Sequence, residues 1–303
     1  MSISVATPNA EAGEIATDAP PSLSMPGAYY DIVAGLGWRN RLAHASVDLR
    51  DGARLWRLIW TLSVLDIRLR YRGSMLGPFW LTLSTSVMVG ALGFLYSRLF
   101  HTDIHTYLPF LSLSLVLWNF ISILVSEGCT SFTQSEVMIR SMRMPLTIHA
   151  GRVVVRNVLV LAHNIIVIVA VFAIMDAWPG IKAFLAIPGF ALWLVDGLAA
   201  CLLLGAFCAR FRDVPPIVAS VMQIAFFVSP ILWSPSVLAH RGLGIVLLNW
   251  NPFYALLEIV RGPMLGAIPS TETYLCAAGY SVGLIFFAGL VFVRTRARIS
   301  FWV

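Results

Sequence analysis

Charged side chains are scarce in this chain. They account for 12% of its 303 residues, whereas soluble domains carry about 25%. So few charges leave too little polar surface to cover a globule of this length, and 58% of the residues are apolar. Several apolar stretches reach the ~20 residues that a helix needs to cross ~30 Å of hydrocarbon. The composition therefore excludes a soluble globular protein and predicts an all-α integral membrane protein.

Lysine and cysteine are also rare. Lys182 is the one lysine beside 20 arginines. Because the arginines flank apolar stretches, we interpret them as topology signals and expect no nucleic-acid partner. The thiols of Cys129, Cys201, Cys208 and Cys276 form no CxxC pair and lie in or beside apolar stretches. This pattern argues against a disulfide framework or a metal site.

Catalytic and nucleotide-binding motifs are missing as well. The chain contains no GxxxxGKS/T phosphate loop, no HExxH and no GxSxG. His101 and His105 have a helical spacing that could suit a metal, but they fall in a short external loop. We therefore expect no catalytic residue and no metal or cofactor bound by this chain, so that it is not an enzyme.

Before the first span, the sequence predicts a tail and then a helix. Residues 1–50 are expected to form a flexible cytoplasmic tail, because residues 1–28 hold acids, prolines and small residues. Residues 1–28 also lack the basic and apolar segments of a signal peptide. Over residues 54–72, leucines and isoleucines follow one helical stripe while arginines face away, as in a helix at the membrane interface. Residues 66–70 also alternate with period two, but a lone strand at a membrane would leave its backbone unpaired, so we favour the helix.

Residues 51–303 form one expected transmembrane domain with six spans. The spans are residues 77–99, 107–127, 152–175, 183–208, 215–235 and 273–293. Between the last two, the apolar runs within 243–262 are short and are broken by an Asn-Pro pair. Broken backbone is tolerated in a membrane where protein or water satisfies it. We expect two short re-entrant external helices there, the alternative being an ordinary external loop.

The basic residues predict the orientation. With six spans and a cytoplasmic amino terminus, 17 basic residues fall on the cytoplasmic side and four on the other. The positive-inside rule therefore places both termini in the cytoplasm. The loop 128–151 is then cytoplasmic, and its residues 135–144 mix apolar, basic and methionine side chains before Pro145. This mixture predicts a short amphipathic helix that can dock on a partner.

Two further features lie within or beside the expected spans. Asp196 is the one acid well inside an expected span. Such a carboxylate could belong to a proton relay or line a pathway, and a hydrogen bond between helices is an equal alternative. Tryptophan, tyrosine and phenylalanine number 10, 8 and 18. Most of them fit an interfacial aromatic belt, and a minority could line a path for cargo.

Four segments carry a family resemblance. They are DIRLRYRGSMLGPFW at 66–80, RMPL at 143–146, FRDV with MQIAFFVSPILW within 211–233, and NPF with EIVRGP within 251–263. In this order they resemble the permeases of type 2 ABC exporters for polysaccharide, the family of O-antigen, capsule and teichoic-acid export. The likeness covers about residues 55–300 and leaves out residues 1–50.

The resemblance implies a homodimer of six-span permeases in a bacterial inner membrane, in contact with membrane lipid. Two copies of a separate ATPase subunit would hold ATP and Mg²⁺, and the cargo would be a polysaccharide linked to undecaprenyl diphosphate or a phospholipid. The helix at 54–72 and the loop 128–151 would contact the ATPase, with candidate coupling residues Arg57, Arg68, Arg72, Glu136, Arg140, Arg143 and Met144. The segment 243–262 would close the external end, with candidate channel or gate residues Trp80, Tyr107, Trp233, Trp250, Phe253, Tyr254, Glu258 and Arg261.

Other functions stay open at this point. An ABC exporter could carry a drug or another hydrophobic compound. A proton-driven secondary transporter would use Asp196 as its titrating group. A membrane-embedded transferase would need clustered acids or phosphate-binding basic residues at one depth, and the sequence alone offers no such cluster.

Overall fold

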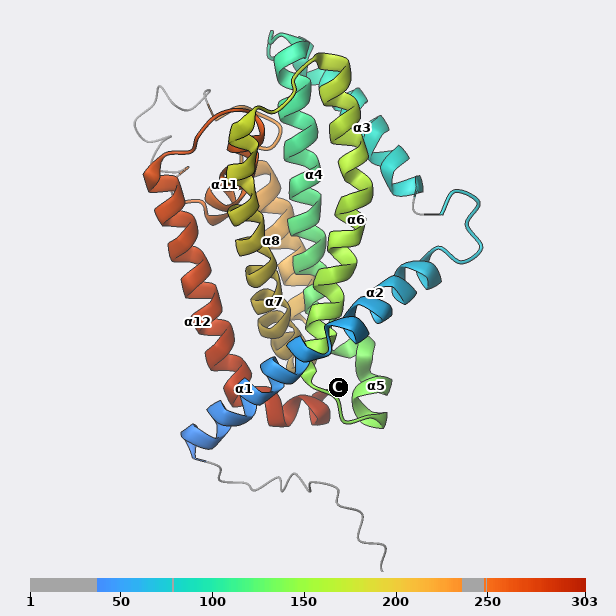
Figure 1. The fold of residues 1–303 in the computed structure, drawn as a ribbon, viewed down its shortest axis with the longest axis vertical. Coiled ribbons are helices and arrows are strands. Elements are labelled where there is room, and N and C mark those ends of the chain that lie inside the picture. Colours follow the sequence, from blue (N-terminus) through green and yellow to red (C-terminus); the bar gives the residue numbers. More distant parts are fainter. Residues whose placement is uncertain (1–36, 78, 236–247, 249) are drawn as a thin grey trace, which may run out of the picture. The chain divides into compact units, whose positions relative to one another are not determined.

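The computed structural model describes residues 37–77, 79–235, 248 and 250–303. Regular structure within these residues is entirely helical (Figure 1), which confirms the predicted all-α class and places residues 66–70 in a helix. The α-helices are α1 (Trp38–Arg54), α2 (Trp56–Arg70), α3 (Phe79–Leu99), α4 (Ile104–Cys129), α5 (Glu136–Ser141), α6 (Leu146–Met175), α7 (Ala186–Arg210), α8 (Val214–Val228), α11 (Pro252–Met264) and α12 (Thr271–Trp302). Two short 3-10 helices accompany them, η1 (Thr133–Ser135) and η2 (Ile181–Leu185).

Most of the expected membrane spans are present. Among the described residues, five helical segments are long and apolar enough to cross a bilayer: α3, α4, α6, η2 with α7, and α12. The fifth expected span, residues 215–235, is shorter, because α8 has 15 residues. That length is about 22 Å at 1.5 Å per residue, against ~30 Å of hydrocarbon. The helix ends where Ser229 takes an extended backbone, which is the conformation that a following proline favours.

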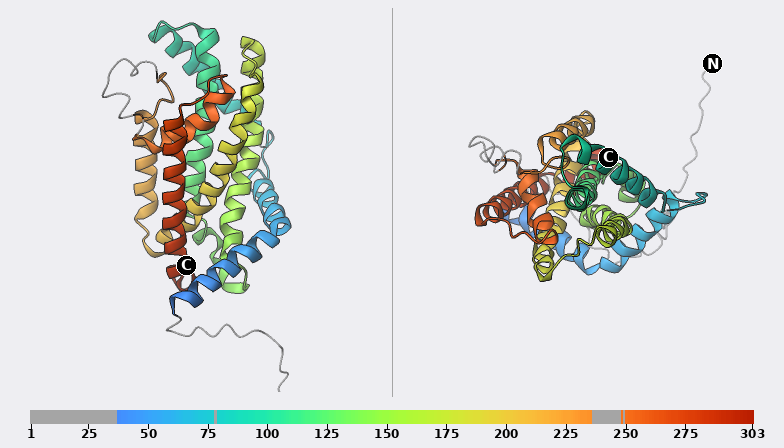
Figure 2. Two further views of the ribbon diagram at one scale, coloured as in Figure 1. Left: turned by 60° about the vertical axis from the view of Figure 1, so that its left-hand side comes forward. Right: turned by 90° about the horizontal axis from the view of Figure 1, so that it is seen from above.

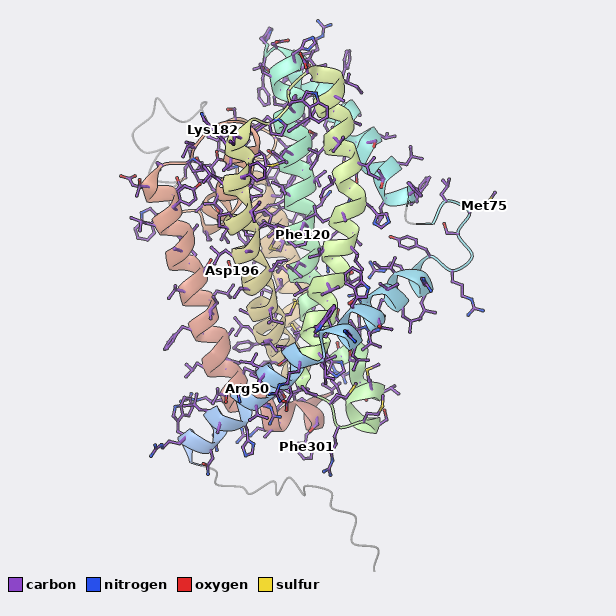
Figure 3. The ribbon with its side chains drawn as sticks, in the orientation of Figure 1. Arg50, Met75, Phe120, Lys182, Asp196 and Phe301 are labelled. Carbon is purple, nitrogen blue, oxygen red and sulfur yellow. The ribbon has the colours of Figure 1, made fainter. Side chains whose placement is uncertain are left out.

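Helices α4 and α7 lie at the centre of the bundle, and α3 and α12 lie at its periphery (Figure 2). In the centre, the Phe120 ring stacks on Trp193 with 5.9 Å between centroids (Figure 3). Close approach of α4 and α7 depends on glycine, since a Cβ at Gly128 would lie 3.3 Å from the Cα of Cys201. Small residues at such contacts are typical of packed membrane helices.

The chain before the first span is more ordered than expected. Helix α1 begins at Trp38, so the prediction of a flexible tail is wrong for residues 38–50, while residues 1–36 lie outside the described part. Figure 1 shows α1 and α2 in succession across the end of the bundle where α5 also lies, which we name the basic end. Helix α2 matches the predicted interface helix at 54–72.

One buried carboxylate explains why α1 is held in place. Asp48 is 2% exposed, and it accepts hydrogen bonds from the backbone amides of Leu146 (3.2 Å) and Thr147 (3.0 Å) at the start of α6. It also accepts from the Thr147 hydroxyl (2.6 Å) and from Arg296 Nε of α12 (2.8 Å). The first amides of a helix have no partner within the helix and attract negative charge. Asp48 therefore caps α6 from another helix and joins α1 to two spans.

The structure describes different shares of the two loops with predicted helices. In the loop 128–151, α5 occupies Glu136–Ser141 within the expected 135–144, and it ends because Met142 is extended. At the opposite end of the bundle, α11 begins at Pro252 and provides the second expected external helix. The first expected helix lies outside the described residues, apart from residues 248 and 250.

Replacing Asp48 with Ala is expected to lower the free energy of unfolding by about 3–5 kcal/mol, because it leaves Arg296 and two helix amides without their partner. Unfolding of the full chain by SDS in mixed micelles measures the loss. Asp51→Ala is the matched control, since Asp51 lies one turn later in α1 and its carboxylate pairs with the exposed Arg54 at 3.9 Å. That change is expected to cost less than about 1 kcal/mol. Equal losses in the two variants would show that Asp48 does not hold α1.

Candidate coupling and gate sites

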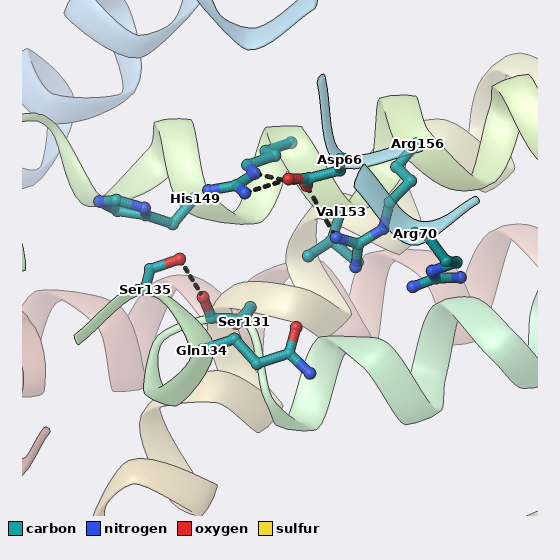
Figure 4. A pocket seen from close by; sticks show the side chains of 9 residues that line it. Asp66, Arg70, Ser131, Gln134, Ser135, His149, Val153 and Arg156 are labelled. Carbon is teal, nitrogen blue, oxygen red and sulfur yellow. Dashed lines mark hydrogen bonds and ion pairs between the residues drawn. The ribbon is translucent and has the colours of Figure 1, made fainter. Parts of the chain in front are cut away.

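A network of charged side chains connects α2, α4 and α6 at the basic end. Arg152 of α6 binds both carboxylate oxygens of Asp66 in α2, and Arg156 Nη1 donates to the same carboxylate (2.8 Å). Arg156 also binds Glu127 of α4 through Nε (3.1 Å) and Nη2 (2.8 Å). Arg70 of α2 completes the network by donating to Glu127 Oε1 (2.7 Å). Figure 4 shows the contact between Asp66 and Arg156.

The inner part of the network is removed from solvent, whereas the Arg70 side chain at its edge is 44% exposed. The Arg156 side chain is 7% exposed and the Asp66 side chain 9%. Burial disfavours the charged form of Arg70, but the hydrogen bond and charge of Glu127 outweigh it, so that the pKa of Arg70 lies above its ordinary value. Removing one partner of a buried ion pair costs far more than removing an exposed one. The network therefore fixes α2 to two spans.

The predicted coupling residues all lie outside this network. Arg57, Arg68 and Arg72 are exposed on α2 and the turn after it. Glu136 and Arg140 form an ion pair along α5 (3.1 Å), and Arg140 also donates to the backbone carbonyl of Val303. In the segment that follows, Arg143 is exposed and Met144 is half-buried. Their contact with an ATPase stays a prediction.

Sequence reasoning missed the residues of the network. Their signal was present, since Arg152 and Arg156 lie one turn apart at the start of an apolar span, where unpaired charges are costly. Their partners Asp66 and Glu127 were not identifiable, because they are 90 and 29 residues away in the chain. The expectation that basic residues do not cluster at one depth is therefore wrong for Arg70, Arg152 and Arg156.

At the opposite end, three side chains bind one turn after α8. Tyr107 of α4 donates through its hydroxyl to the carbonyl of Leu232 (2.5 Å). Arg261 of α11 donates to the carbonyl of Pro230 (2.6 Å), and Asn251 donates through its amide to the Ser229 hydroxyl (2.9 Å). We name residues 229–232 the gate turn. The geometry brings Tyr107 and Arg261 together at this turn, as two of the predicted gate residues.

Arg261 is the centre of this site. It is 1% exposed, and it also donates to Ser114 of α4 (2.9 Å) and to Glu258, one turn earlier in α11 (3.0 Å). Its guanidinium lies over the Phe110 ring, 4.6 Å from the centroid. Such a contact is a desolvated cation–π interaction. Arg261 therefore holds α11 against α4 and the gate turn, and its buried charge is satisfied.

The other predicted gate residues are spread more widely. Phe253 contacts the Trp118 ring (5.5 Å between centroids). Tyr254, the next residue, and Trp233, the residue after the gate turn, are half-buried. Trp250 is 78% exposed, although its carbonyl accepts from Tyr280 (3.0 Å).

Trp80 is exposed at the opposite end of α3 from Phe100, whose ring contacts Tyr107. The structure does not bring Trp80 to the gate turn.

Comparison with known proteins identifies the family. The family model described as ABC-2 type transporter matches residues 57–265, which is more than half of the chain. The chain belongs to the ABC-2 type transporter family. The match runs from α2 to the residue after α11, so that the charged network and the gate turn both lie within it. Helix α1 precedes the matched range and α12 follows it.

Two curated relatives agree with this ABC-2 assignment. The chain is 23% identical over 244 residues to the O-antigen export system permease protein RfbA of Myxococcus xanthus, covering 80% of this chain and 94% of the relative. It is 19% identical over 238 residues to the protein of the same name from Klebsiella pneumoniae, covering 78% and 88%. The predicted family is confirmed, and this ABC-2 chain is a multi-pass membrane protein.

Asp196 lies between two spans of the ABC-2 fold. Its Oδ2 accepts a hydrogen bond from Ser281 of α12 (2.6 Å), and it is 7% exposed in α7. Its Oδ1 has no hydrogen-bond partner among the described residues. Figure 3 shows Asp196 near the middle of the bundle, far from Arg50 at the basic end. The contact with Ser281 is the interhelical hydrogen bond that the sequence left as one of its alternatives.

Replacing Arg261 with Leu is expected to destabilise the docking of α11 by about 3–5 kcal/mol, because Glu258 loses its partner and the gate turn loses a donor. Hydrogen–deuterium exchange of the α11 amides in detergent measures the effect, which should appear as faster exchange over Pro252–Met264. Arg98→Leu serves as control, since Arg98 is exposed on α3 over the Phe94 ring (5.8 Å). Unchanged protection of α11 in the Arg261 variant would contradict the role assigned to Arg261.

Proposed function

We propose that this chain is the permease subunit of an ATP-driven exporter that moves a lipid-linked polysaccharide across a bacterial inner membrane. Membership of the ABC-2 family carries the proposal for the transporter class. The two relatives that are named O-antigen export permeases support a polysaccharide as cargo. A separate subunit, in two copies, supplies ATP hydrolysis, and two copies of this chain form the channel at their interface.

The proposed orientation places the basic end and both termini in the cytoplasm. Arginines at 39–72, 140–156, 210–212 and 294–298 then lie on the inner side, as the positive-inside rule requires. Helix α5 and the exposed face of α2 are the proposed contacts for the ATPase. Met144 and the arginines Arg57, Arg68, Arg72, Arg140 and Arg143 are on or next to these elements.

Helix α4 supports a route from the ATPase to the gate. It carries Glu127 of the charged network at one end and Tyr107 and Ser114, which bind the gate turn and Arg261, toward the other. Its 26 residues span about 39 Å. A force applied to α2 would pass through Asp66 and Arg156 to α4 and reach the gate turn along one helix.

The proposal is tested with the full chain expressed together with its neighbouring genes. Purification through a tag on this chain is expected to yield an ATPase subunit in equal amount. Inverted membrane vesicles are expected to take up polysaccharide into their lumen only with ATP. Asp196→Asn should retain export if ATP is the energy source, because the Ser281 contact can persist with an amide oxygen as acceptor.

Two outcomes would contradict the proposal. One is purification of the chain without an ATPase under conditions that preserve export. The other is export that continues without ATP, stops with a protonophore and is lost in Asp196→Asn, which would instead indicate a proton-coupled carrier. ATP-dependent movement of a hydrophobic compound in place of polysaccharide would keep the ABC mechanism and correct the cargo.

A further inference from the structure

A cavity of about 340 Å³ lies beside the charged network at the basic end. Side chains from α2, from α6 and from the segment that follows α4 surround it (Figure 4). Its volume is at the lower end of the roughly 300–1,000 Å³ that small-molecule sites occupy. It is lined by Asp66, Arg70, Ser131, Gln134, Ser135, His149, Arg152, Val153 and Arg156.

The charges around the cavity sum to a positive value. Three guanidinium groups, those of Arg70, Arg152 and Arg156, meet two carboxylates, those of Asp66 and Glu127. Both carboxylates already accept from two arginines, and Asn157 adds a third donor to Glu127 (2.8 Å). One positive charge is therefore left over at a site whose inner side chains, Arg156 and Asp66, are 7% and 9% exposed, while Arg70 at its edge is 44% exposed. An excess charge that is partly removed from water attracts an anion more strongly than it would in water.

Donors around the cavity are left without protein partners. His149 is 1% exposed, and neither of its ring nitrogens has a hydrogen-bond partner among the described residues. In the hydrogen bonds between described residues, Arg152 uses Nε and Nη2, and Arg70 uses Nη2, so that each guanidinium retains further donors. Gln134 lies at the exposed edge of the cavity. Buried polar groups without partners are rare and call for a ligand or water.

We propose that this cavity is a binding site for a phosphate group. Arginine forks match phosphate oxygens in pairs, and a histidine ring N–H and an amide add single donors. The site lies where the amphipathic helix α2 crosses the spans, which is the level expected for phospholipid headgroups. The phosphate comes from an anionic lipid headgroup or from a soluble phosphate compound. This site is independent of the cargo proposed above.

The test measures binding to the full chain, purified in detergent and stripped of lipid. Inorganic phosphate, pyrophosphate and dihexanoyl phosphatidylglycerol are titrated at constant ionic strength, with dihexanoylglycerol as the phosphate-free probe. At least one phosphate compound is expected to bind saturably, and dihexanoylglycerol is not. Binding of the soluble anions identifies a soluble source, whereas binding of the phospholipid alone identifies a headgroup.

Two variants and one control locate the site. Arg70→Gln removes a charged donor and is expected to raise the Kd about tenfold or more. Arg68→Gln removes the same charge from the same helix, but Arg68 is exposed and does not line the cavity, so its Kd should change less than about twofold.

The second variant, His149→Phe, keeps an aromatic ring, leaves the network intact and removes the ring N–H donor. It is expected to raise the Kd about threefold to tenfold. If Arg70→Gln does not fold, this variant alone tests the phosphate site. Absence of saturable phosphate binding would overturn the proposal. Equal Kd values in the wild type and His149→Phe, or equal effects of Arg70→Gln and Arg68→Gln, would overturn it as well.

Discussion

Charged side chains that are buried at the basic end of the bundle have to be paired. This requirement determines how α1 and α2 pack against the spans. Asp66 and Glu127 accept four arginine contacts between them from α2 and α6. An unpaired carboxylate or guanidinium in the same place would cost several kcal/mol. Asp48 holds α1 in the same way, since its carboxylate accepts hydrogen bonds from two amides of α6 and from Arg296 of α12. Helices α1 and α2 are therefore both attached to the spans by buried charge.

The far end of the bundle repeats this arrangement around a single arginine. Arg261 joins α11 to α4 and to the gate turn, and Tyr107 binds the same turn from α4. Because Pro230 follows an extended Ser229, α8 stops short. The carbonyl groups of Pro230 and Leu232 in the turn after the helix then accept from these donors. Helix α4 contributes to both ends. Buried polar contacts and helix α4 therefore connect α2 continuously to the gate turn.

The sequence predicts the parts of this molecule that depend on local pattern. Apolar length identifies the spans, and the stripe of leucines identifies α2. Helix α1 was missed because its anchor, Asp48, acts on residues 98 and 99 positions away. The network was missed for the same reason, since pairing of Asp66 with Arg156 is a property of tertiary packing. Arg261 was predicted as a gate residue. The sequence did not reveal that its charge is buried and paired, or that it holds α11 against α4 and the gate turn.

The attachment of α2 to the spans is tested most directly by a double-mutant cycle on Asp66 and Arg152. The free energy of unfolding in mixed micelles is measured for the wild type, Asp66→Ala, Arg152→Ala and the double variant. A buried contact in a shared network predicts a coupling energy of about 1.5–3 kcal/mol, so that the double variant loses less than the sum of the two single losses. Losses that add to within about 0.5 kcal/mol would contradict the account, because they would show that the two side chains act independently.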